Sequence, residues 1–276
     1  MSTQPENKQC ILITGASAGF GKLVAEKLLA KGHTVYAAAR RVEKMRDIEA
    51  KGAHILLMDV TDTESVKAGV DQMLAEQGRI DVLFNNAGYG SYGTIECVPL
   101  EEIQYQYDVN VFGLARLAQA VLPQMRKQRS GRIINTASVV GHVSTAVLGW
   151  YASTKFAVEG FSDALRMEVK QFGIDVVLIE PGAVKTEFDE VAFSKLDSLE
   201  HAEDYQPLVS SFRKFTGKLY SKSPGPESTA NAVIKAIEAK HPKTRYATTM
   251  DAKFLPRVKR LFSDKLFDKI VLSQMK

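Results

Sequence analysis

Cysteine is scarce in this sequence, which also lacks a long apolar run. Cys10 and Cys97 are the two cysteines among 276 residues. Two cysteines cannot form a disulfide framework, so we expect two buried thiols in a reducing compartment, the cytoplasm. No run of about 18 apolar residues occurs, and residues 1–9 are polar. We therefore expect neither a membrane-spanning helix nor a signal peptide.

A large excess of either charge is missing as well. The chain carries 36 Lys and Arg against 32 Asp and Glu, a net charge of +4. The basic residues form no patch interleaved with aromatic ones, so nucleic acid is not an expected partner. The five histidines show no ligand spacing, and we expect no catalytic metal.

Short apolar runs alternate with amphipathic stretches along the chain. The predicted strands span residues 11–13, 34–39, 54–58, 81–84, 132–137, 174–180 and 244–248. Helical spacing of apolar residues marks 23–29, 66–75, 100–125, 151–172 and 227–239. This alternation predicts an α/β fold: a doubly wound Rossmann-type fold with a seven-stranded parallel sheet and helices on both faces.

No internal repeat or low-complexity linker divides the chain, so we expect one domain over residues 1–276. Residues 188–226 fit the alternation poorly. We favour a substrate lid there over a surface excursion, because the segment follows a strand end where such sheets bind ligands. Residues 250–276 form a C-terminal helical extension with interleaved apolar and basic residues. We expect it to pack on the domain or at a subunit interface; the alternative is contact with a membrane surface.

A glycine-rich turn joins the first predicted strand to the first predicted helix. Residues 14–21 read Thr-Gly-Ala-Ser-Ala-Gly-Phe-Gly. Glycine allows a backbone to approach a phosphate closely, and a helix N-terminus offers free N–H groups and a positive dipole end. The alternative is a tight turn without a ligand. The residues assigned to cofactor binding in this turn are Gly15, Ser17, Gly19, Phe20 and Gly21.

The second predicted strand ends in Arg40 and Arg41, with no acid. An acid there would accept hydrogen bonds from the ribose of NAD, whereas a guanidinium suits a 2′-phosphate. One charge pair at about 4 Å is worth roughly 4 kcal/mol at an effective dielectric near 20. A third of that biases cofactor choice about tenfold. The sequence therefore predicts NADP(H) in preference to NAD(H), the alternative being a solvated arginine pair.

Four polar side chains suggest chemistry at a carbonyl. Tyr151 and Lys155 share one face of a predicted helix, where the ammonium would stabilise a phenolate. A tyrosine tuned in this way can exchange a proton with a carbonyl or an alcohol. Taken alone, the pair is also typical of a helix surface. Ser138 ends the fifth predicted strand, where its hydroxyl could bond a substrate oxygen. Asn110 lies in an apolar stretch, which favours a buried role.

Taken together, these motifs resemble the short-chain dehydrogenase/reductase family in order and spacing over roughly residues 8–250. Further matches are Asp59 with Val60, the run Asn86, Ala87 and Gly88, and Pro181-Gly182 followed by Thr186. The resemblance implies that Tyr151 is the general acid/base and that Ser138 orients the substrate oxygen. It implies that Lys155 binds the nicotinamide ribose and lowers the tyrosine pKa, and that Asn110 holds a proton-relaying water.

The same resemblance implies how the rest of the cofactor is held. Asp59 would contact the adenine, and Asn86 the adenine-side ribose region. Val184 and Thr186 would meet the nicotinamide amide after the Pro-Gly turn. One departure is Ala18, which stands where many NADP-preferring members carry a basic residue. The NADP(H) prediction therefore rests on Arg40 and on the missing acid.

The predicted reaction is hydride transfer between NADP(H) and a lipophilic ketone, aldehyde or secondary alcohol, similar to the hydroxysteroid and retinol dehydrogenase branch. The alternatives are a non-catalytic dinucleotide-sensing protein and an NAD-dependent alcohol oxidation. The family resemblance suggests a homo-dimer or homo-tetramer. The residues expected to contact the substrate are Ser138, Tyr151, Val140, Leu148 and Phe188, with Tyr89 and Trp150 as further walls.

Overall fold

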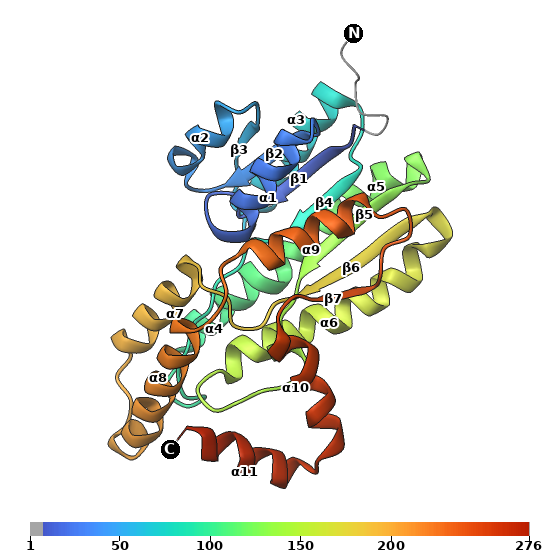
Figure 1. Ribbon diagram of the computed structural model, residues 1–276. Helices are drawn as coiled ribbons and strands as arrows, with labels where there is room; N and C mark the ends of the chain where they lie inside the picture. Colours follow the sequence, from blue (N-terminus) through green and yellow to red (C-terminus); the bar gives the residue numbers. More distant parts are fainter. Residues whose placement is uncertain (1–7, 276) are drawn as a thin grey trace.

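A parallel seven-stranded sheet forms the centre of the computed structural model, which describes residues 8–275 (Figure 1). Its strand order is β3-β2-β1-β4-β5-β6-β7. The order reverses between β1 and β4, so the sheet is doubly wound as predicted. The strands are β1 (Cys10–Thr14), β2 (Thr34–Ala39), β3 (His54–Leu57), β4 (Val82–Asn85), β5 (Gly131–Thr136), β6 (Ile174–Glu180) and β7 (Arg245–Ala247).

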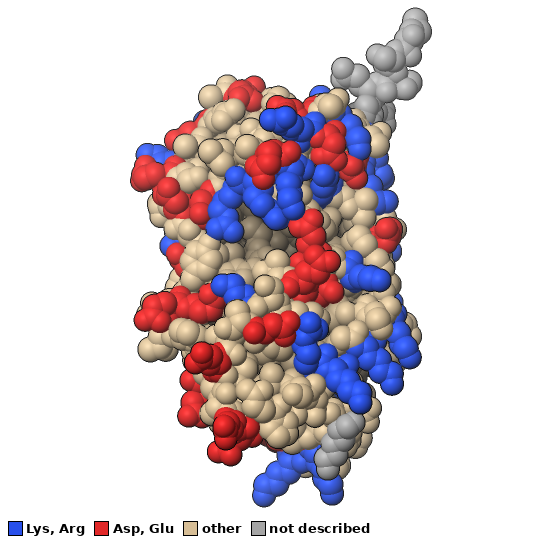
Figure 2. All heavy atoms as spheres, turned by 90° about the vertical axis from the view of Figure 1, so that its left-hand side faces the viewer, with Lys and Arg blue, Asp and Glu red and all other residues tan. Residues whose placement is uncertain are grey.

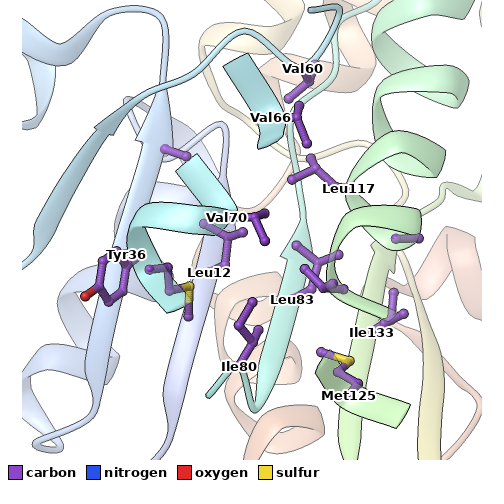
Figure 3. Packing of buried hydrophobic residues seen from close by; sticks show 14 of the residues in the cluster. Leu12, Tyr36, Val60, Val66, Val70, Ile80, Leu83, Leu117, Met125 and Ile133 are labelled. Atoms are coloured by element: carbon purple, nitrogen blue, oxygen red, sulfur yellow. The ribbon is translucent and has the colours of Figure 1, made fainter. Parts of the chain in front are cut away.

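Helices cover both faces of this sheet. They include α1 (Gly19–Ala30), α2 (Arg46–Glu49), α3 (Thr63–Gln77), α5 (Gly113–Gln128), α6 (Gly149–Val169) and α9 (Glu227–Glu238). Successive strand side chains point to opposite faces. Leu12 and Ile133 therefore pack with residues of α3, α5 and α6 (Figure 3), whereas Ile11 and Ile134 pack with residues of α1, α2 and α9. Two apolar layers thus hold the strand ends in fixed positions.

The helix predicted over residues 100–125 contains a local change of winding. It begins as α4 (Leu100–Tyr107), passes through a π-helical turn, η2 (Asp108–Phe112), and continues as α5. A π turn adds one residue to a helical turn, and such turns are frequent at functional sites. Asn110 lies in this turn and is buried. The expected buried role of Asn110 thus has a structural basis.

The segment over residues 188–226 folds mainly as two helices, α7 (Glu187–Ser198) and α8 (Gln206–Ser221). The side chains of Thr186 and Asp189 form a reciprocal capping box at the start of α7. Figure 1 shows both helices at the lower end of the molecule, beyond the sheet. A helical pair was not predicted here, because only Phe212 and Thr216 of α8 are buried and the periodicity is diluted.

The C-terminal extension forms α10 (Met250–Leu261) and α11 (Asp264–Gln274). Phe267 and Met275 are buried against the rest of the chain, as expected for an extension packed on the domain. Within residues 8–275, no helix is both long and apolar enough to cross a membrane. The predicted single domain includes residues 1–7 and 276, and the extension includes 276; these residues lie outside the described part.

The two cysteines differ in burial. Both are free thiols, and Cys10 in β1 is buried as expected. Cys97 is half-buried, so the prediction of a second buried thiol is wrong. It lies in the segment before α4, where its N–H donates to the Thr94 carbonyl.

Candidate active site

A cavity of about 810 Å³ lies over the carboxyl ends of the central strands and reaches the helices of the lower end. Figure 2 shows Lys and Arg atoms directly above a hollow near the centre of the face that it presents. The predicted site residues that line the cavity are Gly15, Ser17, Gly19, Phe20, Arg40, Arg41, Asp59, Val60, Asn86, Ala87, Gly88, Ser138, Val140, Leu148, Tyr151, Lys155, Pro181, Gly182, Val184, Thr186 and Phe188, together with Tyr89.

The glycine-rich turn is shaped by backbone conformation and close packing. Gly15 and Gly19 have φ values of +64° and +54°, a region that favours glycine. A Cβ on Gly15 would lie 2.9 Å from the Cα of Ala87. The side-chain amide of Asn86 donates to the carbonyls of Thr14 (3.1 Å) and Gly15 (3.2 Å). Asn86 therefore braces the turn, besides lining the cavity.

The start of α1 offers its N–H groups to an anion. Its N-cap residue is Ala18, which makes no side-chain hydrogen bond to the helix, and the first turn holds no acid. The positive end of the helix dipole is thus not offset by the chain. Gly21 lies behind the turn and does not line the cavity: a Cβ there would be 2.6 Å from the Gly15 carbonyl oxygen. The packing of the turn therefore requires glycine at position 21.

Two arginines border the cavity beside this turn. The Nη1 atom of Arg40 donates to the Tyr105 hydroxyl (2.5 Å) and lies 3.9 Å from a carboxylate oxygen of Asp59. Arg41 donates to Ser17 Oγ at 3.4 Å and lies 3.6 Å from Glu187. Both guanidinium groups are about half exposed or more, so their charge is available to a ligand.

Ser138, Tyr151 and Lys155 meet below the turn. Ser138 Oγ accepts from the Val140 N–H (3.3 Å) and donates to the Pro181 carbonyl (3.2 Å). Burial raises the pKa of Tyr151, as does the nearby Tyr220, while the neighbouring Ser138 hydroxyl lowers it. Burial lowers the pKa of Lys155 to about 8.

Lys155 is held by the backbone, not by the tyrosine hydroxyl. Its Nζ donates to the Thr136 carbonyl at 2.9 Å and lies 5.7 Å from the ring centroid of Tyr151. The resemblance implies that Lys155 lowers the tyrosine pKa. With the charges of this chain alone, burial dominates and the pKa of Tyr151 is raised. Tyr151 is therefore in its protonated form at neutral pH.

Asn110 lies behind the cavity wall. Its Oδ1 accepts from the Tyr89 N–H (3.0 Å), and its Nδ2 donates to the Tyr89 carbonyl (2.9 Å) and to Thr154 Oγ1 (3.2 Å). Three bonds occupy most of what an amide side chain can form. Asn110 thus joins the segment after β4 to α6, and the water-holding role stays a prediction.

The turn after β6 is tied to the C-terminal extension. The N–H of Gly182 donates to Thr249 Oγ1 (3.0 Å), and that of Ala183 donates to Asp251 Oδ2 (3.0 Å). Thr186 accepts from the Phe188 N–H as the cap of α7. Thr249 and Asp251 were not among the predicted site residues, because their role depends on contacts with a turn about 70 residues earlier.

Comparison with known proteins identifies the family of this chain. A model of the short chain dehydrogenase family matches residues 9–197, more than half of the chain. This chain belongs to the short-chain dehydrogenase/reductase family. Membership makes it a nucleotide-binding oxidoreductase.

Individual relatives of this short-chain dehydrogenase/reductase cover nearly its whole length. A 3-ketodihydrosphingosine reductase of Bacteroides thetaiotaomicron is 40% identical over 238 residues, 86% of each chain. An NADPH-dependent 3-dehydrocapnine reductase of Ornithobacterium rhinotracheale is 35% identical over 274 residues, 96% of each chain. The crystal structure of a short-chain dehydrogenase from Streptomyces avermitilis has a TM-score of 0.82 at 33% identity, covering 97% of this chain and 96% of that one.

The inner half of the cavity in this short-chain dehydrogenase/reductase is apolar. The rings of Phe188 and Tyr151 lie 5.4 Å apart. Trp150 was expected to line the cavity, and this prediction is wrong. Its indole N–H donates to the Ile95 carbonyl instead. Walls that the sequence did not indicate come from α8 and from the last two helices: Phe212, Phe215, Leu219, Tyr220, Leu255, Val258, Phe267, Ile270, Val271 and Met275.

A charged network lies beside Lys155. His142, Glu159 and Glu180 offer ligand atoms within 4.8 Å of one another, a spacing that a metal ion could bridge. The Arg245 guanidinium already lies among these carboxylates, 2.9 Å from Glu159 and 3.2 Å from Glu180. A fixed positive charge thus balances the acids. The network joins α6, the end of β6 and the segment after Ser138.

Proposed function

We propose that this protein is an NADP(H)-dependent carbonyl reductase that acts on a lipophilic ketone or aldehyde, with Tyr151 as the general acid. The observation that carries the proposal is one continuous cavity. Its outer part holds the glycine-rich turn and the two arginines, and its inner part holds Ser138, Tyr151 and apolar side chains. The reverse reaction would oxidise a secondary alcohol with the same residues.

The cofactor would extend from the glycine-rich turn to the turn after β6. Backbone N–H groups at the start of α1 would bind its pyrophosphate. Arg40 and Arg41 would bind a 2′-phosphate, which supports NADP(H) over NAD(H). Asp59 and Val60 lie on the adenine side, and Val184 and Thr186 on the nicotinamide side. An NADPH-dependent relative with 35% identity supports the same preference.

The chemistry that the cofactor supplies when bound is hydride donation to the carbonyl carbon. The chain's own residues would manage the oxygen. Ser138 Oγ would donate a hydrogen bond to the carbonyl oxygen, and Tyr151 would transfer its proton to that oxygen as negative charge develops. The raised pKa of Tyr151 supports this direction, because it keeps the hydroxyl protonated at neutral pH. Lys155 would bind ribose hydroxyls.

The substrate is proposed to be lipophilic because its end of the cavity is lined by apolar side chains. Val140, Leu148 and Phe188 line the same cavity as Tyr151, and the Phe188 ring lies 5.4 Å from the Tyr151 ring. Helices α8 and α11 extend the apolar lining away from the reacting groups. Two relatives are named as reductases, which supports carbonyl reduction as the main direction.

The test is NADPH consumption over a panel of steroids, retinoids, aliphatic 3-ketones, aldehydes and quinones. Tyr151→Phe is expected to lower kcat about 10²–10⁴-fold while NADPH binding, followed by fluorescence, stays close to normal. Tyr92→Phe is the matched control, since its hydroxyl lies 3.2 Å from that of Tyr220 in the same apolar cluster. Near-normal turnover by Tyr151→Phe would refute the mechanism. Equal use of NADH would favour the NAD-dependent alternative.

Domain organisation, assembly and location complete the proposal. We propose one domain over residues 1–276, with 188–226 as a substrate lid, in the cytoplasm, where two free thiols remain reduced. A homo-dimer or homo-tetramer is supported by exposed apolar side chains on η2 and α6, among them Phe112 and Phe156. Light scattering of the protein and of Phe156→Ser measures the assembly.

A further inference from the structure

The last two helices carry two apolar surfaces. Leu255, Val258, Phe267 and Val271 line the cavity on the inner side. A second group of apolar side chains is exposed on the outer side. We define the outer ridge as these exposed residues: Phe254, Leu261, Phe262, Leu266 and Ile270. The packing of α10 and α11 on the domain explains the inner surface and leaves the outer ridge uncovered in the described chain.

The outer ridge follows helical geometry. Phe254 and Leu261 lie seven residues apart in α10, and Leu266 and Ile270 lie four apart in α11, so each pair shares one face of its helix. Leu261 is 78% exposed. Exposed apolar side chains that recur on one face mark an interaction surface more often than scattered ones do. The outer ridge is therefore a candidate contact surface.

A row of basic side chains accompanies the outer ridge. In four places a basic residue directly precedes an apolar residue of the outer ridge. A fifth basic residue, Arg257, lies between the two pairs of α10. All five bases are exposed, and none forms an ion pair within residues 8–275. The four pairs are Lys253-Phe254, Arg260-Leu261, Lys265-Leu266 and Lys269-Ile270.

The corner between the two helices is fixed internally. Lys259 forms an ion pair with Asp264 and lies 4.8 Å from the centroid of the buried Phe267 ring. One base is thus used to hold α10 and α11 together, and the others remain free. Figure 2 shows Lys and Arg atoms at the lower end of the molecule, the end at which α11 lies in Figure 1.

We infer that the outer ridge docks on the surface of an anionic phospholipid bilayer. A helix surface with apolar side chains beside Lys and Arg is the pattern of an interfacial helix, in which the apolar residues enter the acyl boundary and the bases meet phosphate groups. Residues 250–275 contain six basic and three acidic residues, so they supply most of the chain's net charge of +4. A bilayer, unlike a small partner, contacts both helices at once.

The docking surface is continuous with the cavity. Ile270 is 36% exposed on the outer ridge and also lines the cavity. A lipophilic molecule in the bilayer would therefore enter between the last helices without crossing water. This use of the surface rests on the proposed function, whereas the docking itself rests on the outer ridge and its bases.

The experiment is co-sedimentation of the full chain with vesicles of phosphatidylcholine alone or mixed with phosphatidylglycerol. We expect binding to the mixed vesicles, little binding to phosphatidylcholine alone, and loss of binding at high salt. Each basic residue contributes roughly fivefold, so Lys265→Gln/Lys269→Gln should weaken binding about 25-fold. Phe254→Ser/Leu261→Ser should abolish it. None of these four residues lines the cavity.

The matched control is Leu57→Ser/Ile95→Ser, which removes two exposed apolar side chains far from α10 and α11 in sequence and should bind like the parent. Circular dichroism and NADPH binding report whether each variant is folded. The inference is overturned if the parent does not bind mixed vesicles or if folded Phe254→Ser/Leu261→Ser binds normally. It is also overturned if light scattering shows that the same variant dissociates a dimer, because the ridge would then join two copies.

NADPH consumption with a water-soluble ketone, measured without vesicles, separates this inference from the proposed function. Binding to mixed vesicles without any reductase activity would refute the reductase and leave the docking surface standing. Reductase activity without vesicle binding would refute the docking surface and leave the reductase standing.

Discussion

Arg245 is a permanently charged partner of two buried carboxylates, those of Glu159 and Glu180. Its Nη2 lies 2.9 Å from Glu159 and its Nε lies 3.2 Å from Glu180, and both carboxylates are less than 10% exposed. It also contacts Asp163 at 2.8 Å. Arg245→Met keeps the length of the side chain and removes its charge and donors. The substitution therefore leaves two buried acids without their fixed cation.

The expected loss of stability is large for one substitution. Removing one partner of a buried ion pair costs about 3–5 kcal/mol, because an uncompensated charge stays buried. Arg245 itself is 31% exposed, so water can replace part of its effect. We expect a loss of about 3 kcal/mol in the free energy of unfolding near pH 8, at the lower end of that range.

The loss should shrink as the pH falls. Burial and the neighbouring Glu180 raise the pKa of Glu159. A raised carboxyl pKa means that the folded state gains stability as the pH falls through it. A hydrogen bond with Glu180 raises the pKa of His142, and a protonated His142 stabilises the fold at low pH and loses that effect as the pH rises through its folded pKa. Arg245 lowers the pKa of both groups, so its removal raises both pKa values further, and the variant gains more stability than the parent as the pH falls towards 5.5.

Urea unfolding near pH 8 and pH 5.5 measures both statements. Arg245→Lys keeps the charge and loses the planar fork, so it should lose less than Arg245→Met. Lys31→Ala is the exposed control, whose pair with Glu238 is worth about 1 kcal/mol or less. A loss below about 1 kcal/mol for Arg245→Met at pH 8, or an equal loss at both pH values, would refute the reasoning.

Three further predictions concern the cofactor end. Arg40→Asp should reduce the ratio of kcat/KM for NADPH to that for NADH at least about tenfold; an unchanged ratio removes Arg40 from 2′-phosphate binding. Gly15→Ala should weaken NADPH binding and destabilise the fold by about 1–3 kcal/mol, because φ is +64° and Ala87 leaves no room for a Cβ; calorimetry measures both. Burial lowers the pKa of Lys155 to about 8, so NADPH affinity should fall as the pH rises through 8, and Lys155→Met should lack that transition in a fluorescence titration.

The sheet was predictable from the sequence because its inner strands are short, mostly apolar runs that are largely buried on both faces. The bounds of β2 and β6 agree with the prediction, and those of the other five strands differ from it by no more than one residue at either end. The π turn at Asn110 was not predictable. One added residue in a helical turn leaves the apolar spacing nearly unchanged over a long helix, so the segment looks like a single α-helix.

The candidate site was predictable where it depends on short motifs at strand ends. All predicted site residues except Gly21, Asn110 and Trp150 line one cavity. The walls from α8 and α11 were missed, because their apolar residues face a cavity and each other instead of the sheet. Arg245 was missed as a partner of Glu159, since 86 residues separate them in the chain and charge spacing in sequence carries no record of such a pair.

The two hydrogen bonds from the turn after β6 to Thr249 and Asp251 divide the protein into a constant and an exchangeable part. Upstream of them lie the glycine-rich turn, the two arginines, Tyr151 and Lys155. Downstream lie residues 252–275, several of which line the cavity. Replacement of this segment by that of another family member, with Thr249 and Asp251 retained, is expected to alter which molecules fit the cavity while the glycine-rich turn, Ser138 and Tyr151 stay in place.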